Sequence, residues 1–437
     1  MRTVVTPPFD KKRFVRSDGQ NLILAESPEA VDAANREFYA KFPYPWPPMS
    51  FPRLEDPDFE MVMLNQSIGY FGHRTIPSDA NIWVAGCGTN QAVYTALRFP
   101  KTTVIGSDLS PASLEIAARN AATLGIANLV LRQESLNIVT YCDEFDYVIC
   151  TGVIHHNAEP KKALENIGRA LRPNGVLEVM VYNRFHRTFT TAFQKAVRTI
   201  TRHNSRASSY EEELAVAKAI AATEPIASSA HLAPFRNCHE SKLADAVIQP
   251  VEYSYTVESL AALVAECGLE LMLPCYDQFS QASGATWNMQ FGTTELQKRF
   301  DTLPDGVRWQ VANLLFLERS PMLWFFVRHR QDASDGHYEA SVNQEFLDRK
   351  FVRATTNLRN YVRGARDLNY RRSLRSIAYP FKHKDNLVRC VVDRADGRRA
   401  MRQILQEVGV DTASHKTVAD LRVQMTTSLC PYLWSAE

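Results

Sequence analysis

Two glycines and a carboxylate have the spacing of a site that binds a nucleoside. Gly86 and Gly88 directly follow an apolar run that ends at Ala85, and Asp108 ends the next such run, 22 positions after Gly86 (108 − 86). Short β-branched runs suit buried parallel strands, and glycines permit a tight turn where the backbone approaches a ligand closely. At this spacing a carboxylate accepts hydrogen bonds from ribose hydroxyls. Residues 81–110 therefore predict a strand, a glycine turn, a helix, a second strand and a nucleoside-binding acid.

The residue at the third glycine position of a dinucleotide site distinguishes between nucleosides. A Gly-x-Gly-x-x-Gly turn uses its third glycine for close packing of the helix on the strand, and Gln91 stands there. The run Ala-Gly-Cys-Gly-Thr at 85–89 resembles the first motif of class I S-adenosylmethionine-dependent methyltransferases, whose ligand carries no phosphate. The resemblance covers residues 80–185 well and residues 245–330 more loosely. It implies S-adenosylmethionine as cofactor and methyl donor, with S-adenosylhomocysteine as product.

The resemblance also implies which residues hold the cofactor. The family has an acid that faces the adenine amino group; this acid aligns with Ser135, and Glu134 stands one position earlier. Side chains alternate along a strand, so the two cannot both face the adenine, and both stay candidates. The expected cofactor-binding residues are Ala85, Gly86, Cys87, Gly88, Asn90, Asp108, Leu109, Glu134, Ser135 and Thr151.

Strands and helices keep alternating after this stretch. Ser110 caps a helix with Pro111 in its first turn, and Gly125 ends it. Such an alternation predicts βαβ units with right-handed crossovers. Together with the resemblance it predicts an α/β fold: a seven-stranded Rossmann-like methyltransferase sheet whose last strand lies antiparallel beside the sixth. The later strands are expected at 129–132, 145–150, 176–181, 269–274 and 322–328.

Two adjacent histidines follow the expected strand at 145–150. His155 and His156 resemble the "LHH" motif of the family, at the carboxyl end of a strand, where open α/β sheets bind ligands. A metal site is not expected, because adjacent side chains in a turn point apart and no further His or Cys cluster completes a ligand set. A general-base role and a packing role both stay open. The catalytic candidates are His155, His156, Asp245 and Tyr253.

An aromatic and proline-rich run at 42–48 precedes the first strand and must be extended. It is either an arm packed on the core or a lid over the site, as a similar Tyr-Pro-Tyr-Pro segment is in the family. Further along the chain, Gln249 stands where the family often has histidine, so a neutral amide replaces a base there. The expected substrate-pocket residues are Tyr39, Tyr44, Trp46, Gln249 and Tyr255.

The last hundred residues have no place in the expected sheet. Residues 331–437 predict a separate, mainly α accessory domain, and 387–405 weakly resembles the winged-helix modules that bind leader peptides. Dimerisation or bracing of the substrate roof is the alternative role. Nucleic acid is not an expected partner, because acidic residues dilute the arginines. The arginines of this part include Arg359, Arg363, Arg366, Arg371, Arg372 and Arg375.

Composition sets broad limits on the protein. The 437 residues allow two or three domains, the formal net charge is only +2, and 45% of the residues are hydrophobic. No apolar run has the length of a membrane span, and eight scattered cysteines predict free thiols in a cytoplasmic protein. The expected divisions are an N-terminal arm or lid at 1–78, a cofactor-binding core at 79–183, a helical insertion forming the substrate roof at 184–248, the rest of the core at 249–330 and the C-terminal domain at 331–437.

The predicted function is methyl transfer to a small-molecule acceptor, of the kind found in specialised metabolism, in an enclosed aromatic pocket. The alternative is a peptide or protein methyltransferase whose C-terminal domain docks the substrate. The sequence leaves open whether the acceptor atom is oxygen, nitrogen or carbon, whether a base is used, and whether the protein is a homodimer.

Overall fold

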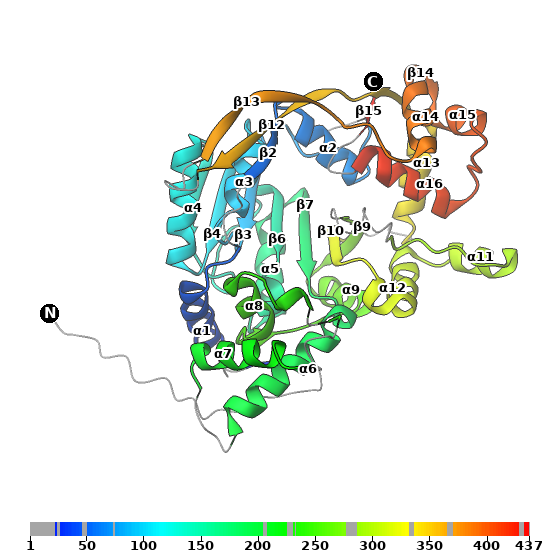
Figure 1. Ribbon diagram of the computed structural model, residues 1–437. Coiled ribbons are helices and arrows are strands. Elements are labelled where there is room, and N and C mark those ends of the chain that lie inside the picture. Colours follow the sequence, from blue (N-terminus) through cyan, green and yellow to red (C-terminus); the bar gives the residue numbers. More distant parts are fainter. Residues whose placement is uncertain are drawn as a thin grey trace.

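The computed structural model describes most of the chain (Figure 1). The described residues are 22–23, 27–45, 50–72, 75–203, 208–224, 230–231, 233–276, 286–331, 336–364, 370–427 and 432–436. Trp46 lies outside these residues.

A seven-stranded sheet forms the centre of the molecule, as predicted. Its strand order is β5-β4-β3-β6-β7-β10-β9. β10 pairs antiparallel with both β7 and β9, whereas the pairs from β5 to β7 are all parallel, so the last strand is inserted antiparallel beside the sixth. The strands are β3 (Asn81–Ala85), β4 (Thr103–Asp108), β5 (Leu129–Gln133), β6 (Phe145–Thr151), β7 (Leu171–Val181), β9 (Leu269–Pro274) and β10 (Leu323–His329).

Helices cover both faces of this sheet, because alternate residues of its strands point to opposite sides. On β3, Ile82 and Val84 join the hydrophobic cluster that contains the α3 residues Ala92 and Ala96, whereas Trp83 joins the cluster on the opposite face. The covering helices are α3 (Gln91–Arg98) and α4 (Pro111–Leu124) on one face, and α5 (Pro160–Ala170), α9 (Val257–Glu266) and α12 (Asp305–Phe316) on the other. A further helix, α11 (Thr294–Asp301), precedes α12.

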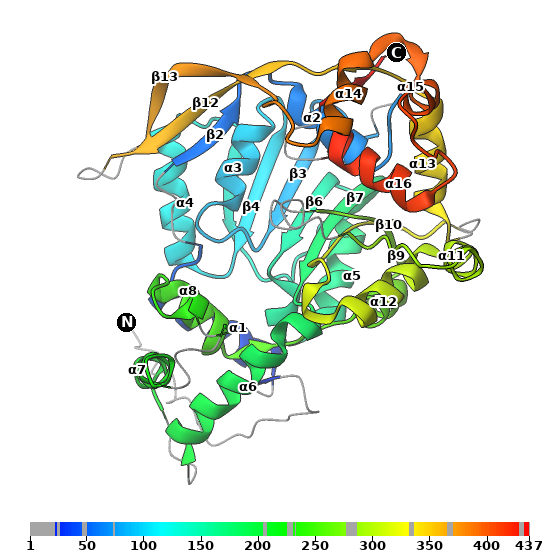
Figure 2. The ribbon, with the colours of Figure 1, turned by 45° about the vertical axis from the view of Figure 1, so that its right-hand side comes forward.

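A layer of helices closes the end of the sheet at which the parallel strands finish (Figures 1 and 2). Phe38 and Phe42 belong to one hydrophobic cluster with Phe193, Leu214 and Leu243, so the N-terminal arm and the 184–248 segment share a core. The layer consists of α1 (Pro28–Lys41), α6 (Arg184–Thr201), α7 (Tyr210–Ala221) and α8 (Glu240–Val247). The short turns η1 (Ile154–His156) and η4 (Ala233–Phe235), and a small pair of strands, β1 (Leu22–Ile23) with β8 (Val251–Glu252), adjoin it.

The C-terminal part is not mainly α, which corrects the prediction. Its arginine-rich stretch forms two long antiparallel strands, β12 and β13, and β12 also pairs with β2 from the N-terminal arm, at the other end of the molecule (Figure 1). Arg359 on β12 donates to the Glu55 carboxylate at 2.6 Å. The strands are β2 (Ser50–Leu54), β11 (Lys350–Arg353), β12 (Thr356–Arg363), β13 (Tyr370–Tyr379), β14 (Asp396–Ala400) and β15 (Leu433–Ser435). The helices are α2 (Phe59–Ser67), α13 (Tyr338–Asp348), α14 (Asn386–Arg394), α15 (Met401–Glu407), α16 (His415–Arg422) and the π-helical turn η6 (Val423–Thr427), with the 3₁₀ turn η5 (Leu317–Arg319) after α12.

The C-terminal residues also share a hydrophobic core with the central sheet. Val342 and Phe346 of α13 lie in one buried cluster with Ile82 of β3, Met272 of β9 and Phe326 of β10. Burial of a side chain of this size stabilises the fold by about 1.5–3 kcal/mol. Removal of residues 340–437 would therefore uncover part of the core of the central sheet, in addition to any docking surface.

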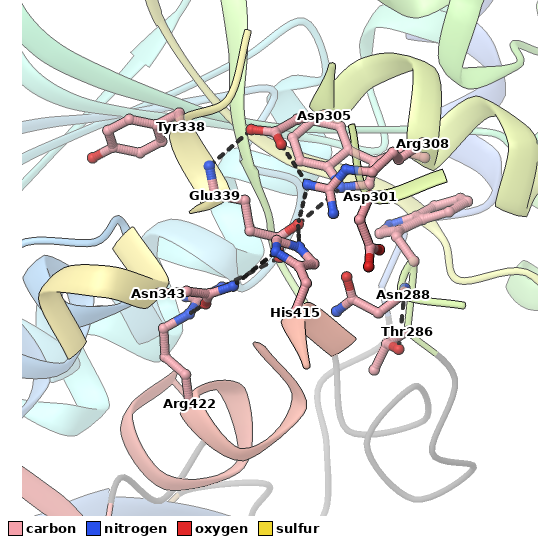
Figure 3. A network of polar contacts seen from close by, with 12 residues as sticks. Thr286, Asn288, Asp301, Asp305, Arg308, Tyr338, Glu339, Asn343, His415 and Arg422 are labelled. Carbon is pink, nitrogen blue, oxygen red and sulfur yellow. Dashed lines mark hydrogen bonds and ion pairs between the residues drawn. The ribbon is translucent and has the colours of Figure 1, made fainter. Parts of the chain in front are cut away.

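A buried ionic network joins the same two parts of the chain (Figure 3). The Glu339 carboxylate on α13 lies 3.4 Å from the Arg308 guanidinium on α12 and 3.3 Å from that of Arg422 on α16. Its own backbone N–H donates to Asp305 at 2.8 Å. Burial acts to raise the pKa of Glu339, but His415 and the two arginines outweigh it and hold that pKa at about 2. Glu339 is therefore an anion that neutralises two buried cations.

Replacement of Glu339 by glutamine should destabilise the protein strongly. The substitution keeps the side-chain shape but leaves Arg308 and Arg422 buried with less compensating charge, and breaking a buried pair costs about 3–5 kcal/mol. Urea denaturation followed by circular dichroism measures the loss. Glu345→Gln on the same helix is the control, because its ion pair with Arg349 is half exposed and should contribute about 0–1 kcal/mol. Equal losses in the two variants would contradict a structural role for the network.

Candidate active site

The glycine turn after β3 is built for close approach. Gly86 and Gly88 have φ values of 74° and 53°, in the left-handed region that glycine adopts without strain. The Gly88 N–H donates to the Asp108 carboxylate at 2.8 Å, which ties the turn to the end of β4. A Cβ atom added at Gly88 would lie 2.5 Å from the carbonyl oxygen of Tyr44. The N-terminal arm therefore lies directly on the turn, with no space for a side chain between them.

A cavity of about 430 Å³ begins at this turn, within the range of about 300–1,000 Å³ of sites that enclose small ligands. It lies at the carboxyl ends of β3, β4, β6 and β7, where open α/β sheets bind their ligands. The lining residues are Asp32, Asn35, Tyr39, Tyr44, Pro45, Gly86, Cys87, Gly88, Asn90, Gln91, Tyr94, Asp108, Leu109, Ser113, Glu134, Leu136, Thr151, Gly152, Val153, His156, Asn157, Met180, Tyr182 and Asp245.

Eight of the ten expected cofactor residues line this cavity. Ala85 does not, because it is fully buried in the core beneath the turn. Of the two candidates for the adenine-facing position, Glu134 lines the cavity and Ser135 does not. The Glu134 carboxylate accepts hydrogen bonds from the Tyr141 hydroxyl at 2.7 and 2.9 Å. The Ser135 hydroxyl instead donates to the carboxylate of Asp32 on α1, at 2.5 Å. The lining residues of the expected set are Gly86, Cys87, Gly88, Asn90, Asp108, Leu109, Glu134 and Thr151.

Asp108 has the surroundings expected of a ribose-binding carboxylate. Burial raises its pKa, and hydrogen bonds from the backbone N–H groups of Ser110, Gly88 and Leu109 oppose that rise. The N–H groups of Ser110 and Gly88 each approach one carboxylate oxygen at 2.8 Å. Each oxygen has a second lone pair, so the carboxylate can still accept from a diol in the cavity.

A carboxylate surrounded by tyrosines marks the other end of the cavity. Asp245 on α8 accepts hydrogen bonds from the hydroxyls of Tyr39, at 3.0 Å, and Tyr182, at 3.3 Å. Burial raises the pKa of Asp245, and the nearby His156 and the bond from Tyr39 oppose that rise. Asp245 in turn contributes to raising the pKa of Tyr44 to about 12, after the larger effect of burial. The tyrosines are therefore neutral hydrogen-bond donors near neutral pH.

The two histidines have different surroundings. Nδ1 of His156 lies 2.7 Å from the Val251 carbonyl oxygen, which can only accept, so Nδ1 carries the proton. Burial lowers the pKa of His156, so Nε2 keeps a free lone pair near neutral pH. His155 does not line the cavity: its ring packs against that of Tyr182 at a tilt of 30°, with centroids 3.8 Å apart, and neither ring nitrogen has a hydrogen-bond partner among the described residues.

Three other sequence candidates lie behind the cavity wall. Gln249 is fully buried, donates to Asn35 at 2.9 Å and accepts from the Val251 N–H at 2.6 Å. The Tyr253 hydroxyl donates to the carbonyl oxygen of Ala158 at 3.3 Å. Tyr255 packs in the hydrophobic cluster under the sheet. These residues support the cavity wall and do not line it, so the expected direct roles of Gln249, Tyr253 and Tyr255 are corrected.

Several lining residues were not among the sequence candidates. Asp32 and Asn35 lie on α1 together with Tyr39. Asn35 follows Asp32 by three positions and Tyr39 follows it by seven, so the three side chains share one face of the helix. Because Tyr39 was a candidate, this spacing could have predicted that Asp32 and Asn35 also line the cavity. Tyr182 directly follows β7, so its place at the carboxyl end of a strand was also readable from the sequence.

Comparison with known proteins agrees with this geometry. A model described as a methyltransferase domain matches residues 78–225. The uncharacterized protein syc1184_c of Synechococcus sp. is 25% identical over 410 residues, which cover 91% of this chain and 94% of that protein. The uncharacterized protein RP028 of Rickettsia prowazekii is 30% identical over 152 residues, 33% of this chain and 58% of that protein.

Solved structures share the fold over most of the chain. PKMT2 from Rickettsia typhi superimposes with a TM-score of 0.54 at 14% identity, covering 90% of this chain and 77% of that one. The same protein in complex with AdoHcy gives a TM-score of 0.53 at 15% identity. Residues 78–225 therefore match a methyltransferase domain, and the chain shares the fold of the PKMT2 structure. The glycine turn, Asp108 and Glu134 fit S-adenosylmethionine as the methyl donor of such a domain.

Two further findings concern metal ions and membranes. Among the described residues, no group of three or more His, Cys, Asp or Glu side chains is arranged to hold a metal ion. None of the described helices is long and apolar enough to cross a membrane.

Substitution of Gly88 by alanine should weaken cofactor binding in this methyltransferase. The new methyl group would meet the Tyr44 carbonyl at 2.5 Å and impose a positive φ on a residue with a side chain, so the turn and the arm must separate. Strain of this kind costs about 1–3 kcal/mol. Calorimetric titration with S-adenosylhomocysteine should show affinity reduced by about tenfold or more, since 1.4 kcal/mol corresponds to tenfold. Gly292→Ala, where a Cβ meets nothing within 4 Å, should bind as the wild type does. Unchanged affinity in Gly88→Ala would contradict the packing of the arm on the turn.

Proposed function

We propose that the protein transfers a methyl group from S-adenosylmethionine to a small acceptor held in the tyrosine-lined end of the cavity. The observation that carries this proposal is the continuity of one cavity from the glycine turn and Asp108 to Asp245 and Tyr182. A donor held at the first end and an acceptor held at the second would share one enclosed space. Proximity of this kind is the main contribution a protein makes to a displacement reaction.

The cofactor supplies a methyl group on a positively charged sulfur, so the protein needs no covalent nucleophile. The residues of this chain align the acceptor, exclude water and take up a proton where the acceptor carries one. Tyr39, Tyr44 and Tyr182 provide an apolar wall, and the hydroxyl groups of Tyr39 and Tyr182 hold Asp245 in place. Nε2 of His156 has the free lone pair that a general base needs.

A small acceptor is favoured over a docked polypeptide by the position of the C-terminal part. No described residue after Asp245 lines the cavity, and the sheet made by β2, β12 and β13 lies at the other end of the molecule (Figure 2). The core shared by α13 and the central sheet is a sufficient reason for the C-terminal part to be present. A winged-helix-like docking role for residues 331–437 stays a prediction.

Substitution of Asp108 by alanine tests the cofactor half of the proposal. The change removes the carboxylate that would accept from the ribose hydroxyls, and loss of hydrogen bonds to a charged group costs about 1.5–3 kcal/mol each. Titration calorimetry with S-adenosylhomocysteine should show a Kd increased by about tenfold to a hundredfold.

The matched control is Asp79→Ala, at an exposed aspartate just before the amino end of β3, whereas the cavity lies at the carboxyl end of that strand. This variant should bind S-adenosylhomocysteine as the wild type does. Two results would contradict the proposal. One is a wild-type protein that gives no binding heat with S-adenosylmethionine or S-adenosylhomocysteine, and the other is an Asp108→Ala variant that binds both normally.

Substitution of His156 by asparagine tests the base. The asparagine amide can still donate to the Val251 carbonyl in place of Nδ1, but no Nε2 lone pair remains. Loss of a general base lowers kcat by about 10²–10⁴-fold. In the wild type, kcat should fall as the pH falls through the lowered pKa of His156, below 6.5, because protonated Nε2 cannot accept a proton. That acidic limb should be absent from the variant.

The control for this variant is His155→Phe. It keeps the stacking on Tyr182 and removes two ring nitrogens that have no hydrogen-bond partner among the described residues, so kcat should stay close to the wild-type value. An unchanged kcat and pH profile in His156→Asn would leave His156 with a packing role only.

A further inference from the structure

The charged side chains that line the cavity are all acidic. Four acidic residues line it, and no lysine or arginine is among its described lining residues. Asp108 and Glu134 lie at the cofactor end, and Asp32 accepts from Ser135 and Asn137 at that same end. The fourth acid, Asp245, lies at the acceptor end.

Asp245 forms no ion pair within 4 Å among the described residues, although His156 and Arg187 are near enough to oppose the rise that burial causes in its pKa. Arg187 pairs with a different carboxylate: its guanidinium lies 2.6 Å from the Glu252 carboxylate and 4.3 Å from the centroid of the Tyr182 ring. Asp245 therefore receives two hydroxyl groups, from Tyr39 and Tyr182, and no ion pair within 4 Å in the described structure. A buried carboxylate without a direct ion-pair partner is costly, and a cationic ligand would reduce that cost.

We propose that the acceptor is an amine, which enters as an ammonium group and is held by Asp245 among Tyr39, Tyr44 and Tyr182. This inference rests on the proposed function, because it names the substrate class of the same site. A carboxylate neutralises the ammonium charge, and tyrosine ring faces attract cations within about 6 Å. A carboxylate or phosphate acceptor would be repelled by Asp245, and a neutral alcohol would leave its charge unpaired.

The residues present can complete the chemistry of an amine. The ammonium group loses a proton to Nε2 of His156, which later passes it to solvent. The freed nitrogen lone pair forms the new nitrogen–carbon bond while the carbon–sulfur bond of the donor breaks, and that electron pair stays on sulfur. The products are a methylated ammonium and a neutral thioether, so the single positive charge moves from sulfur to nitrogen.

The same ammonium group can come from a free small amine or from a lysine side chain. Both present a narrow alkyl chain that ends in a cation, which the tyrosine-lined end of the cavity can surround. The enclosure by α1 favours the free amine, and the experiment below includes one arm for each source.

The test uses the full-length protein and S-adenosylmethionine labelled on the methyl group. The free-amine arm compares n-butylamine with n-butanol and butyrate, which have similar chains and differ in the charge of the head group. The polypeptide arm compares an unstructured lysine-containing peptide with the same peptide carrying norleucine. Calorimetry of each small probe against the protein loaded with S-adenosylhomocysteine measures binding separately from transfer. We expect label in n-butylamine, and binding of its ammonium form, without label in butanol, butyrate or the norleucine peptide.

The variant that tests the role of Asp245 is Asp245→Asn. It keeps the side-chain shape and an acceptor oxygen for a tyrosine hydroxyl, but it removes the negative charge. We expect kcat/KM for the amine to fall by about tenfold or more, mainly through KM, with the Kd of S-adenosylhomocysteine unchanged. The control is Glu240→Gln on the same helix, whose carboxylate is half exposed and pairs with Lys218. This control should leave both quantities unchanged.

The outcomes separate the two levels of proposal. The amine inference is overturned if the protein binds S-adenosylhomocysteine but neither binds nor methylates any amine probe. It is also overturned if the protein labels butanol or butyrate as well as butylamine. In both cases the proposed methyltransferase function is unaffected. An unchanged KM for the amine in Asp245→Asn overturns the role given to Asp245. Failure to bind S-adenosylhomocysteine overturns the proposed function itself. Label in the lysine peptide alone assigns the amine to a polypeptide, and label in n-butylamine alone assigns it to a small molecule.

Discussion

A chain of buried amides holds the active-site end of this protein together. The Asn35 carboxamide on α1 donates to the backbone carbonyl of His156 at 2.8 Å and accepts from the Gln249 side chain, which in turn accepts from the Val251 N–H. These groups are buried, so each unmade bond would cost about 1–3 kcal/mol. The chain links three segments that are far apart in sequence: the N-terminal arm, the turn after β6 and the stretch before β8. The position of His156, and with it the wall of the cavity, depends on all three.

The remainder of the molecule braces that arrangement from the opposite side. The arm that carries α1 continues through Tyr44 over the glycine turn and then into β2, which pairs with β12 from the C-terminal part. The C-terminal helices are joined to the sheet by the Glu339 network and by a shared hydrophobic cluster. One segment of chain therefore contacts both the cofactor loop and the C-terminal strands. The C-terminal part stabilises the core on which the site is built and contributes no described residue to the cavity lining.

The cofactor half of the site could be predicted from sequence because its information is local. The strand before Gly86, the cap at Ser110 and the acid at 108 all lie within one βαβ unit, and Ser110 and Gly125 begin and end α4 as expected. The strand at 269–274 was predicted with the bounds it has. The acceptor half was predicted less well: Gln249, Tyr253 and Tyr255 turned out to lie behind the wall. Their orientation depends on contacts with Asn35, Ala158 and the core under the sheet, which no local pattern records.

The C-terminal strands show a second limit of local reasoning. An arginine-rich stretch has good helix formers, yet residues 356–363 and 370–379 are strands, because they pair with each other and the first of them also pairs with β2 some 300 positions earlier. Strand preference depends on such neighbours more than on the residue types alone. The same dependence explains the charge pattern of the cavity. Asp32, on the arm, and Asp245, after the insertion, meet the sheet only when the helical layer closes over it, so the excess of negative charge belongs to the assembled site and to none of its segments.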